Sequence, residues 1–284
     1  MNEKIINGKL AADEILNKIK QQIEQLREDK CKIPALAVVL VGDDPASQVY
    51  VRNKKAACGK VGIQSLEYNL PITTTESELL NLVQQLNQDN TVDGVLVQLP
   101  LPAHLDSKII IDAINPDKDV DGFCRYNIGS LAINQANLCP CTPHGVMYLL
   151  DGLKIDYHGK HAVILGTSNI VGRPMALELI NRGATVTMCN SKSRPLEQYV
   201  SSADILIAAI GKPRFIPGAW LKPGAIAIDV GINRLENGKL CGDIDFESAL
   251  ERVKFITPVP GGVGPMTIAM LLQNTLQCYT QQNN

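Results

Sequence analysis

The chain has 284 residues, 45% of them hydrophobic, and it carries 27 Lys and Arg against 29 Asp and Glu. This length suffices for two domains that each bury a core. The near balance of charge excludes a global field that would attract nucleic acid or anionic lipid. Apolar runs such as 35–41 and 205–210 are far shorter than a membrane span, so they predict buried strands and no membrane association. Residues 1–4 lack the layout of a secretory signal, which predicts a cytoplasmic protein.

The eight cysteines are scattered along the chain, and no CxxC pair accompanies histidines at the spacing of metal ligands. In a cytoplasmic chain such cysteines are usually buried, reduced thiols. We therefore expect no metal site.

Apolar β-rich runs alternate with segments of helical period, which is typical of parallel sheets with crossover helices. In the first half the pattern predicts helices at 9–29, 45–60, 76–89 and 106–114, and strands at 34–41, 65–70 and 93–98. Asp44 followed by Pro45 is a helix start, because it combines a side-chain acceptor with a proline at the first helical position. Tyr50 and Lys54 therefore lie on a helix.

The periodicity fails from residue 117 to 143, where Asp, Gly, Asn and Pro accumulate, and a helix then starts at Thr142-Pro143. Beyond it the pattern predicts strands at 161–165, 184–188, 204–210 and 225–230, and helices at 171–181 and 195–201. Residues 256–264 are too rich in Pro and Gly for a helix and predict a loop. A last amphipathic helix, 265–279, follows.

These elements predict an α/β protein with two α/β domains. Residues 1–120 form an N-terminal parallel-sheet domain for substrate and catalysis, and residues 140–264 form a C-terminal Rossmann-like dinucleotide-binding domain. Residues 121–139 are the interdomain junction. The C-terminal helix, 265–284, is expected to cross back to the first domain.

A glycine turn, Gly166-Thr-Ser-Asn-Ile-Val-Gly172, lies between a predicted strand and a predicted helix. Glycine lets the backbone approach a phosphate, and a helix N-terminus offers free N–H groups to it. The spacing is not GxGxxG, so an ordinary strand-to-helix turn remains the alternative. The regular alternation around the turn favours a dinucleotide site.

The next strand ends in Asn190-Ser-Lys-Ser-Arg194, without the carboxylate that typically binds the ribose 2′-hydroxyl of NAD. Ser191, Lys192 and Arg194 instead offer a hydroxyl and two cations that suit a 2′-phosphate. This pattern predicts NADP, and a solvated basic turn is the alternative.

The first half contains polar residues in places where chemistry is expected. Tyr50 and Lys54 share a helix face at spacing i, i+4, although such pairs are more often plain surface pairs. Gln98 closes a predicted strand just before Leu99, and ligands bind at the carboxyl ends of parallel strands. Asp121 lies in the junction loop, where a simple turn is the local alternative.

Eight motifs in order make the chain resemble the bifunctional methylenetetrahydrofolate dehydrogenase/cyclohydrolase family over almost its whole length. They are Tyr50-Val-Arg-Asn-Lys54, Val97-Gln-Leu-Pro-Leu-Pro102, Asp119-Val-Asp-Gly122, Pro140-Cys-Thr-Pro143 with Gly145, Ile170-Val-Gly172, Asp229-Val-Gly-Ile-Asn233, Gly242-Asp-Ile-Asp245 and Pro260-Gly-Gly-Val-Gly-Pro-Met-Thr267.

The resemblance implies NADP⁺-dependent oxidation of 5,10-methylenetetrahydrofolate, hydrolysis of the methenyl product to 10-formyltetrahydrofolate, and a homodimer. It makes Lys54 the catalytic lysine, Tyr50 the ring that stacks on folate, Gln98 the partner of Lys54 and Asp121 the anchor of the pterin. It assigns further folate contacts to Leu99, Pro260, Gly261, Gly262 and Thr267, and cofactor contacts to Gly166, Thr167, Ser168, Ile170, Val171, Gly172, Ser191 and Ile232. Lys192 and Arg194 join the predicted cofactor residues through the basic turn described above.

The chain departs from the family pattern at two places. Thr167 stands where family members usually carry the arginine that approaches the 2′-phosphate, which leaves NAD as the alternative cofactor. Cys124-Arg125 replaces a common His-Pro after the pterin anchor. A monofunctional NAD-dependent methylenetetrahydrofolate dehydrogenase and a non-catalytic dinucleotide-binding module are the alternative functions.

Overall fold

The computed structural model describes residues 3–283, which divide into two compact units. The N-terminal unit comprises Asp13–Cys141 and the segment from Ile268 onward, and the C-terminal unit comprises Thr142–Thr267 and the residues up to Ala12. Residues 1, 2 and 284, at the ends of the predicted domains, lie outside the described part. No helix within 3–283 is both long and apolar enough to cross a membrane.

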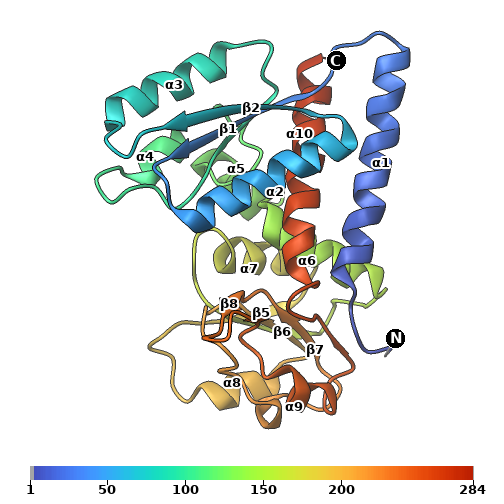
Figure 1. Ribbon diagram of the computed structural model, residues 1–284. Coiled ribbons are helices and arrows are strands. Elements are labelled where there is room, and N and C mark those ends of the chain that lie inside the picture. Colours follow the sequence, from blue (N-terminus) through green and yellow to red (C-terminus); the bar gives the residue numbers. More distant parts are fainter. Residues whose placement is uncertain (1–2, 284) are drawn as a thin grey trace. The chain divides into compact units, whose positions relative to one another are not determined.

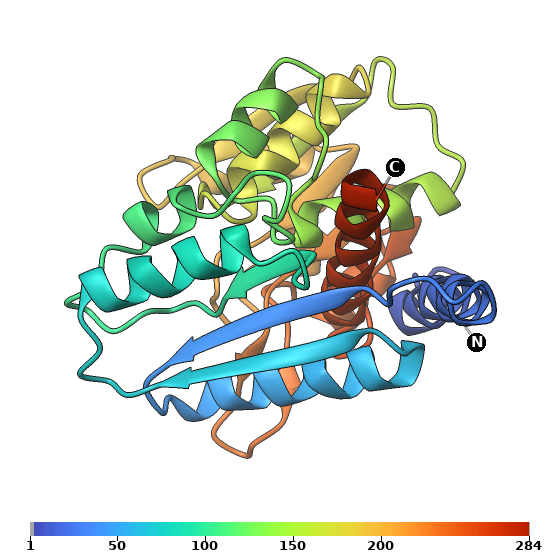
Figure 2. The same ribbon diagram turned by 90° about the horizontal axis from the view of Figure 1, so that it is seen from above.

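The N-terminal unit is built on a parallel three-stranded sheet in the order β2-β1-β3. Its strands are β1 (Ala35–Val41), β2 (Gln64–Leu70) and β3 (Gly94–Val97). Helix α2 (Pro45–Val61) covers one face, and α3 (Glu76–Gln88) and α4 (Ser107–Asp112) cover the other (Figures 1 and 2). Because both faces are covered, every residue of β1 is buried, and its sequence is a continuous apolar run.

The remaining helices of this unit are α5 (Arg125–Ala132) and most of α1 (Gly8–Glu28) and α10 (Val263–Asn283). Gly94 of β3 lies close to two other segments. A Cβ added there would lie 3.6 Å from Thr275 of α10 and 2.4 Å from Val120, just before the interdomain junction. The absence of a side chain at Gly94 therefore allows β3 to pack against both segments.

The C-terminal unit contains a parallel five-stranded sheet in the order β10-β7-β6-β4-β5. Its strands are β4 (His161–Leu165), β5 (Thr185–Cys189), β6 (Ile205–Ala208), β7 (Ile226–Asp229) and β10 (Phe255–Ile256). The order reverses at β4, whose successor β5 lies on one side and β6 on the other. In such sheets a ligand binds outside the carboxyl ends of the strands at the reversal.

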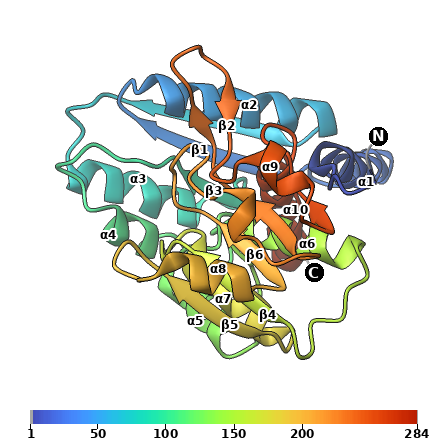
Figure 3. The same ribbon diagram turned by 90° about the horizontal axis from the view of Figure 1, so that it is seen from below.

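Helices α6 (Cys141–Gly152), α7 (Gly172–Asn181), α8 (Leu196–Ser202) and α9 (Phe246–Leu250) accompany this sheet, with a short 3₁₀ helix, η1 (Gly218–Trp220). Figure 3 shows α8 lying across the strands, and Val200 of α8 and Ala249 of α9 join one apolar core with Leu165 and Leu206. A two-stranded antiparallel hairpin, β8 (Asn233–Arg234) and β9 (Leu240–Cys241), completes the unit.

The predicted helices and parallel strands agree with the structure within a few residues, and the differences occur where little apolar surface is buried. The prediction missed α5, in which only Asn127 and Leu131 are buried, the short helices α9 and η1, and the two-residue strands β8, β9 and β10. The predicted loop 256–264 begins with the last residue of β10 and ends within α10, which starts at Val263.

The first residues also lie in a different unit from the predicted one. The prediction placed them in the N-terminal domain, but Ile6 donates its amide to Ile256 at 2.8 Å, and Ile256 donates its own to Lys4 at 2.9 Å. These bonds form a parallel bridge to β10, because Ile5 pairs with Ile256. Backbone pairing therefore assigns this segment to the C-terminal unit.

Candidate functional site

The first group of predicted site residues lies in the N-terminal unit, around α2. Asp44 caps this helix by accepting the Ser47 amide at 2.8 Å, Pro45 begins it, and Gly62 ends it at a φ of 90°. The predicted helix start is confirmed, and it determines which residues face the sheet. Lys54 faces inward and is only 8% exposed, whereas Tyr50, one turn earlier, is 45% exposed.

The buried ammonium group of Lys54 has a specific partner at the end of β3. Its Nζ donates to Oε1 of Gln98 at 3.0 Å, and Nε2 of Gln98 donates to the carbonyl of Leu99 at 2.6 Å. The second bond orients the amide so that its oxygen faces the lysine, because the nitrogen is already engaged. A buried lysine needs such a partner, and Gln98 supplies it.

Asp121 is the third member of this group. Removal of its carboxyl group from water raises its pKa to about 6, the positive charge of Lys54 opposes that rise, and the negative charge of Asp119 adds to it. A hydrogen bond with the Cys141 thiol also favours the charged form. Burial raises the pKa of Cys141 well above its ordinary value, so it stays a neutral thiol. Lys54, Gln98 and Asp121, far apart in sequence, therefore form one electrostatic group.

The second group lies in the C-terminal unit, where β4 runs into α7. Gly166 has a φ of +116°, and a Cβ there would lie 2.2 Å from the carbonyl oxygen of Ala209; a Cβ at Gly172 would lie 2.1 Å from that of Gly166. Ser168 Oγ accepts the amides of Val171 and Gly172 at 3.2 and 3.3 Å. The two glycines thus permit a turn too tight for any side chain.

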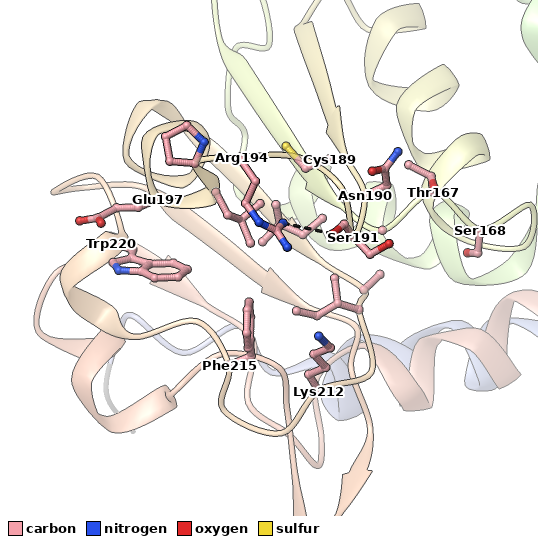
Figure 4. A pocket seen from close by; sticks show the side chains of 16 residues that line it. Thr167, Ser168, Cys189, Asn190, Ser191, Arg194, Glu197, Lys212, Phe215 and Trp220 are labelled. Atoms are coloured by element: carbon pink, nitrogen blue, oxygen red, sulfur yellow. Dashed lines mark hydrogen bonds between the residues drawn. The ribbon is translucent and has the colours of Figure 1, made fainter.

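A cavity of about 670 Å³ opens beside this turn, at the carboxyl ends of β4, β5 and β6 (Figure 4). Of the predicted cofactor residues, five line it: Gly166, Thr167, Ser168, Ser191 and Arg194. In Figure 4, Thr167 and Ser191 lie on one side, Phe215 and Trp220 on the other, and Arg194 between them. Phe215 and Trp220 meet edge to face, with ring centroids 6.2 Å apart.

Two cations and one carboxylate line the cavity. Arg194 is oriented by bonds from Nη1 to the carbonyls of Ser191 at 3.1 Å and Ser193 at 2.7 Å. Lys212 Nζ lies 5.0 Å from the centroid of the Phe215 ring. Glu197 is near Trp220 and points away from Ser191 (Figure 4). The side of the cavity next to the glycine turn therefore combines hydroxyls with positive charge, which suits an anion.

The other predicted cofactor residues do not line this cavity. Val171 and Gly172 lie at the start of α7. Ile170 and Ile232 are exposed, and Ile232 lies 3.5 Å from the position of a Cβ at Gly264. Lys192 turns outward into solvent, with its amide bonded to Asn190 Oδ1 at 2.9 Å.

The predicted folate loop after β10 is well defined. The Gly261 carbonyl accepts the Lys9 amide at 3.0 Å, a Cβ at Gly262 would lie 2.5 Å from the Pro258 carbonyl oxygen, and Thr267 Oγ1 lies 2.9 Å from Thr142 Oγ1. Pro260 follows a cis peptide bond. The contact of this loop with folate stays a prediction.

Sequence reasoning missed several residues of the cavity beside the glycine turn, above all Ile210, Lys212, Phe215 and Trp220. They follow β6, the strand next to β4. A usable signal was present, because a polar, glycine-containing segment after a buried strand marks a ligand edge once the strand order is known. The order itself is not visible in the sequence.

These features define a class of protein: an α/β enzyme with a dinucleotide-binding unit and a second unit that holds a lysine, an amide and a carboxyl group together. Two family models match the chain. The catalytic domain of tetrahydrofolate dehydrogenase/cyclohydrolase matches residues 6–121, and the NAD(P)-binding domain of the same family matches residues 140–283.

Individual relatives agree with these matches. The bifunctional protein FolD of Neisseria gonorrhoeae is 58% identical over 276 residues, 97% of each chain. The crystal structure of the FolD enzyme of Campylobacter jejuni is 48% identical, with a TM-score of 0.96 over 98% of each chain. That of Trypanosoma brucei, complexed with NADP and an inhibitor, is 36% identical, with a TM-score of 0.93 over 98% of this chain and 97% of its own.

The chain belongs to the tetrahydrofolate dehydrogenase/cyclohydrolase family. The prediction of a bifunctional, FolD-type enzyme with two α/β domains is confirmed, and the monofunctional and non-catalytic alternatives are less supported.

Asp121 is expected to titrate near pH 6, well above its ordinary pKa of 3.8. Because folding raises this pKa, the group contributes stability below about pH 4, and that contribution is lost as the pH rises through 6. The unfolding free energy of the wild type minus that of Asp121→Asn should fall by up to about 3 kcal/mol between pH 4 and 7. Urea denaturation at each pH measures both unfolding free energies, and Asp117→Asn, at an exposed aspartate, is the control. If the difference between wild type and Asp121→Asn did not change with pH, the raised pKa of Asp121 would be contradicted.

Proposed function

We propose that the chain oxidises 5,10-methylenetetrahydrofolate to the methenyl compound with NADP⁺ and then hydrolyses it to 10-formyltetrahydrofolate. The observation that carries the proposal is the hydrogen bond from buried Lys54 to Gln98, with the raised pKa of Asp121 beside it. A dinucleotide-binding module would have no use for this group, and the cavity next to Gly166 accounts for the dinucleotide alone.

The oxidation makes modest demands on the protein. Loss of hydride from the methylene carbon leaves a resonance-stabilised amidinium cation, so no proton is removed and no strong base is required. The nicotinamide ring, when bound, supplies the hydride acceptor. The protein contributes by holding the substrate in position, and we assign this task to the exposed ring of Tyr50 and to the carboxyl group of Asp121.

The hydrolysis requires proton transfer. Water must add to the cation and lose a proton, and a ring nitrogen must then gain one as the ring opens. As the free amine, Lys54 can take the proton that the adding water loses, and as the ammonium it then gives that proton to the ring nitrogen, while Gln98 holds the lysine nitrogen in place as a positioning residue. The Asp121 carboxylate suits the donor-rich edge of a pterin, where it accepts two hydrogen bonds. Leu99 and the loop of Pro260, Gly261, Gly262 and Thr267 complete the proposed folate contacts.

NADP is the proposed cofactor, and the fit rests on side chains of the cavity. Ser191 and Arg194 lie beside the glycine turn, and Lys212 adds a second cation. The carbonyl bonds of Arg194 use only Nη1 among the described residues, so Nε and Nη2 remain as donors for a phosphate. These groups replace the charge that the family arginine would supply at Thr167. The relative complexed with NADP supports this choice.

Lys54→Met should reduce cyclohydrolase activity to background, because methionine fills the same space but carries no proton, while the substrate still binds. Decay of the methenyl absorbance measures the activity. Lys55→Met is the matched control, since this neighbour is exposed and pairs with Glu67 at 2.7 Å. Asp121→Ala should instead weaken folate binding in both reactions. Hydrolysis at the wild-type rate in Lys54→Met would refute the role of the lysine.

Arg194→Ala should lower kcat/KM for NADP⁺ by about 10- to 100-fold, because one charge-assisted bond is worth about 1.5 to 3 kcal/mol. The value for NAD⁺, which lacks the 2′-phosphate, should change little. Steady-state oxidation with both cofactors measures this, and Lys160→Ala, which removes an exposed charge elsewhere in the same unit, serves as control. An equal loss with both cofactors would show that Arg194 does not contact the 2′-phosphate.

We also propose that the chain forms a homodimer, because the family resemblance implies one. Sedimentation equilibrium at micromolar concentration should give twice the 30.8 kDa mass of the chain. A monomer mass at every concentration tested would contradict this proposal.

A further inference from the structure

The aspartates of two motifs, Asp229-Val-Gly-Ile-Asn233 and Gly242-Asp-Ile-Asp245, have no role in the chemistry above. The structure brings Asp229 and Asp243 together, next to the segment that follows β6. Asp243 is completely buried and Asp229 is 4% exposed. A buried carboxylate is costly unless donors surround it, and each of these two carboxylates has such a set of donors.

The carboxylate of Asp243 accepts three consecutive backbone amides of the segment after β6. Oδ2 accepts Ile210 N at 2.7 Å and Gly211 N at 3.1 Å, and Oδ1 accepts Lys212 N at 2.8 Å. Nδ2 of Asn233 donates to Oδ1 at 2.9 Å as a fourth bond. Successive amides around one anion form a backbone nest, and here the anion is the protein's own side chain.

Asp229 in turn holds Asp243. Its Oδ1 accepts the amide of Asp243 at 2.9 Å, and its Oδ2 accepts that of Ile244 at 2.8 Å. The glycines of the two motifs are required by this packing, because a Cβ at Gly231 would lie 2.3 Å from the Asp243 carboxylate and one at Gly242 would lie 1.9 Å from that of Asp229.

The segment held in this way is a wall of the dinucleotide cavity. Ala209, Ile210, Lys212 and Phe215 all line it, and Figure 4 shows Lys212 and Phe215 directed into it. Because Asp243 accepts the amides of residues 210–212, these three amides are not available to a bound dinucleotide. The glycine turn and the cationic side chains remain to bind its anionic part.

We infer that Asp243 is a positioning residue for dinucleotide binding: its carboxylate fixes the segment 209–215 and so sets the places of Lys212 and Phe215. The inference rests on the proposed binding of a nicotinamide dinucleotide in this cavity. It concerns dehydrogenase activity only, because the hydrolysis uses no dinucleotide and the groups proposed for its proton transfer, Lys54 and Gln98, lie in the other unit.

The test compares Asp243→Asn with wild type. Asparagine has nearly the same shape, but it provides one acceptor oxygen and turns an N–H₂ group toward amides that also donate. The fluorescence of Trp220, which is the single tryptophan of the chain and lines the cavity, reports occupancy during titration with NADP⁺ or NAD⁺. We expect the Kd for both to rise at least about tenfold, with KM for the dinucleotide rising and cyclohydrolase activity staying within about twofold.

Asp245→Asn is the matched control, because this nearby carboxylate bonds Ser248 and does not contact the segment. If Asp243→Asn does not fold, Asn233→Asp tests the inference instead. This substitution replaces a hydrogen-bond donor to Asp243 with a second negative charge, and residue 233 is partly exposed, so the variant is expected to fold. It should raise the Kd more than Asn233→Ala does.

A folded Asp243→Asn with wild-type affinity, or with dehydrogenase and cyclohydrolase lost in parallel, overturns the inference. If Asn233→Asp has to decide, an effect on the Kd no larger than that of Asn233→Ala overturns it too. If the wild type itself binds neither dinucleotide, the proposed function fails instead, so the two failures are distinguishable.

Discussion

Parallel pairing of buried strands is the constraint on which both units depend. Strands such as β1, β4 and β6 are covered on both faces, so their backbone amides must be bonded within the sheet and their side chains must be apolar. Polar groups can appear only where a strand ends. Gln98 follows β3, Gly166 follows β4, Asn190 follows β5 and Ala209 follows β6, so the predicted site residues at these strand ends collect at one edge of each sheet.

Buried charged side chains in both units have hydrogen-bond partners within the protein. Lys54 has the Gln98 oxygen and the field of Asp121, whereas Asp243 has three amides and the side chain of Asn233. Burial raises the pKa of Asp229 to about 7, although backbone amides donate to its carboxylate and oppose the rise. Four hydrogen bonds within the protein satisfy the carboxylate of Asp243, whereas burial leaves Asp121 with a raised pKa.

The positive charge in the cavity beside Gly166 comes from outside the glycine turn. Thr167 supplies no charge, but Arg194 and Lys212 reach the cavity from two other segments. Arg194 is held by carbonyls of its own turn, and Lys212 lies on the wall fixed by Asp243. The position of positive charge in this cavity therefore depends on several strand ends and not on the glycine turn alone.

The sequence by itself determined the alternation of strands and helices, the helix start at Asp44-Pro45, and the glycine turn, because each depends on local periodicity or on the backbone preferences of single residues. Ordered motifs were enough to indicate the family. Local signals could not show α5 or the short strands, which bury too little to impose a period, nor the pairing of residues 3–6 with β10.

Tertiary structure alone decided which groups meet. The bond from Lys54 to Gln98 joins residues 44 positions apart, and that from Lys212 to Asp243 joins residues 31 apart. Strand order placed Lys212, Phe215 and Trp220 beside the glycine turn. Such contacts arise from sheet topology and burial, which are properties of the folded chain and leave no fixed spacing in the sequence.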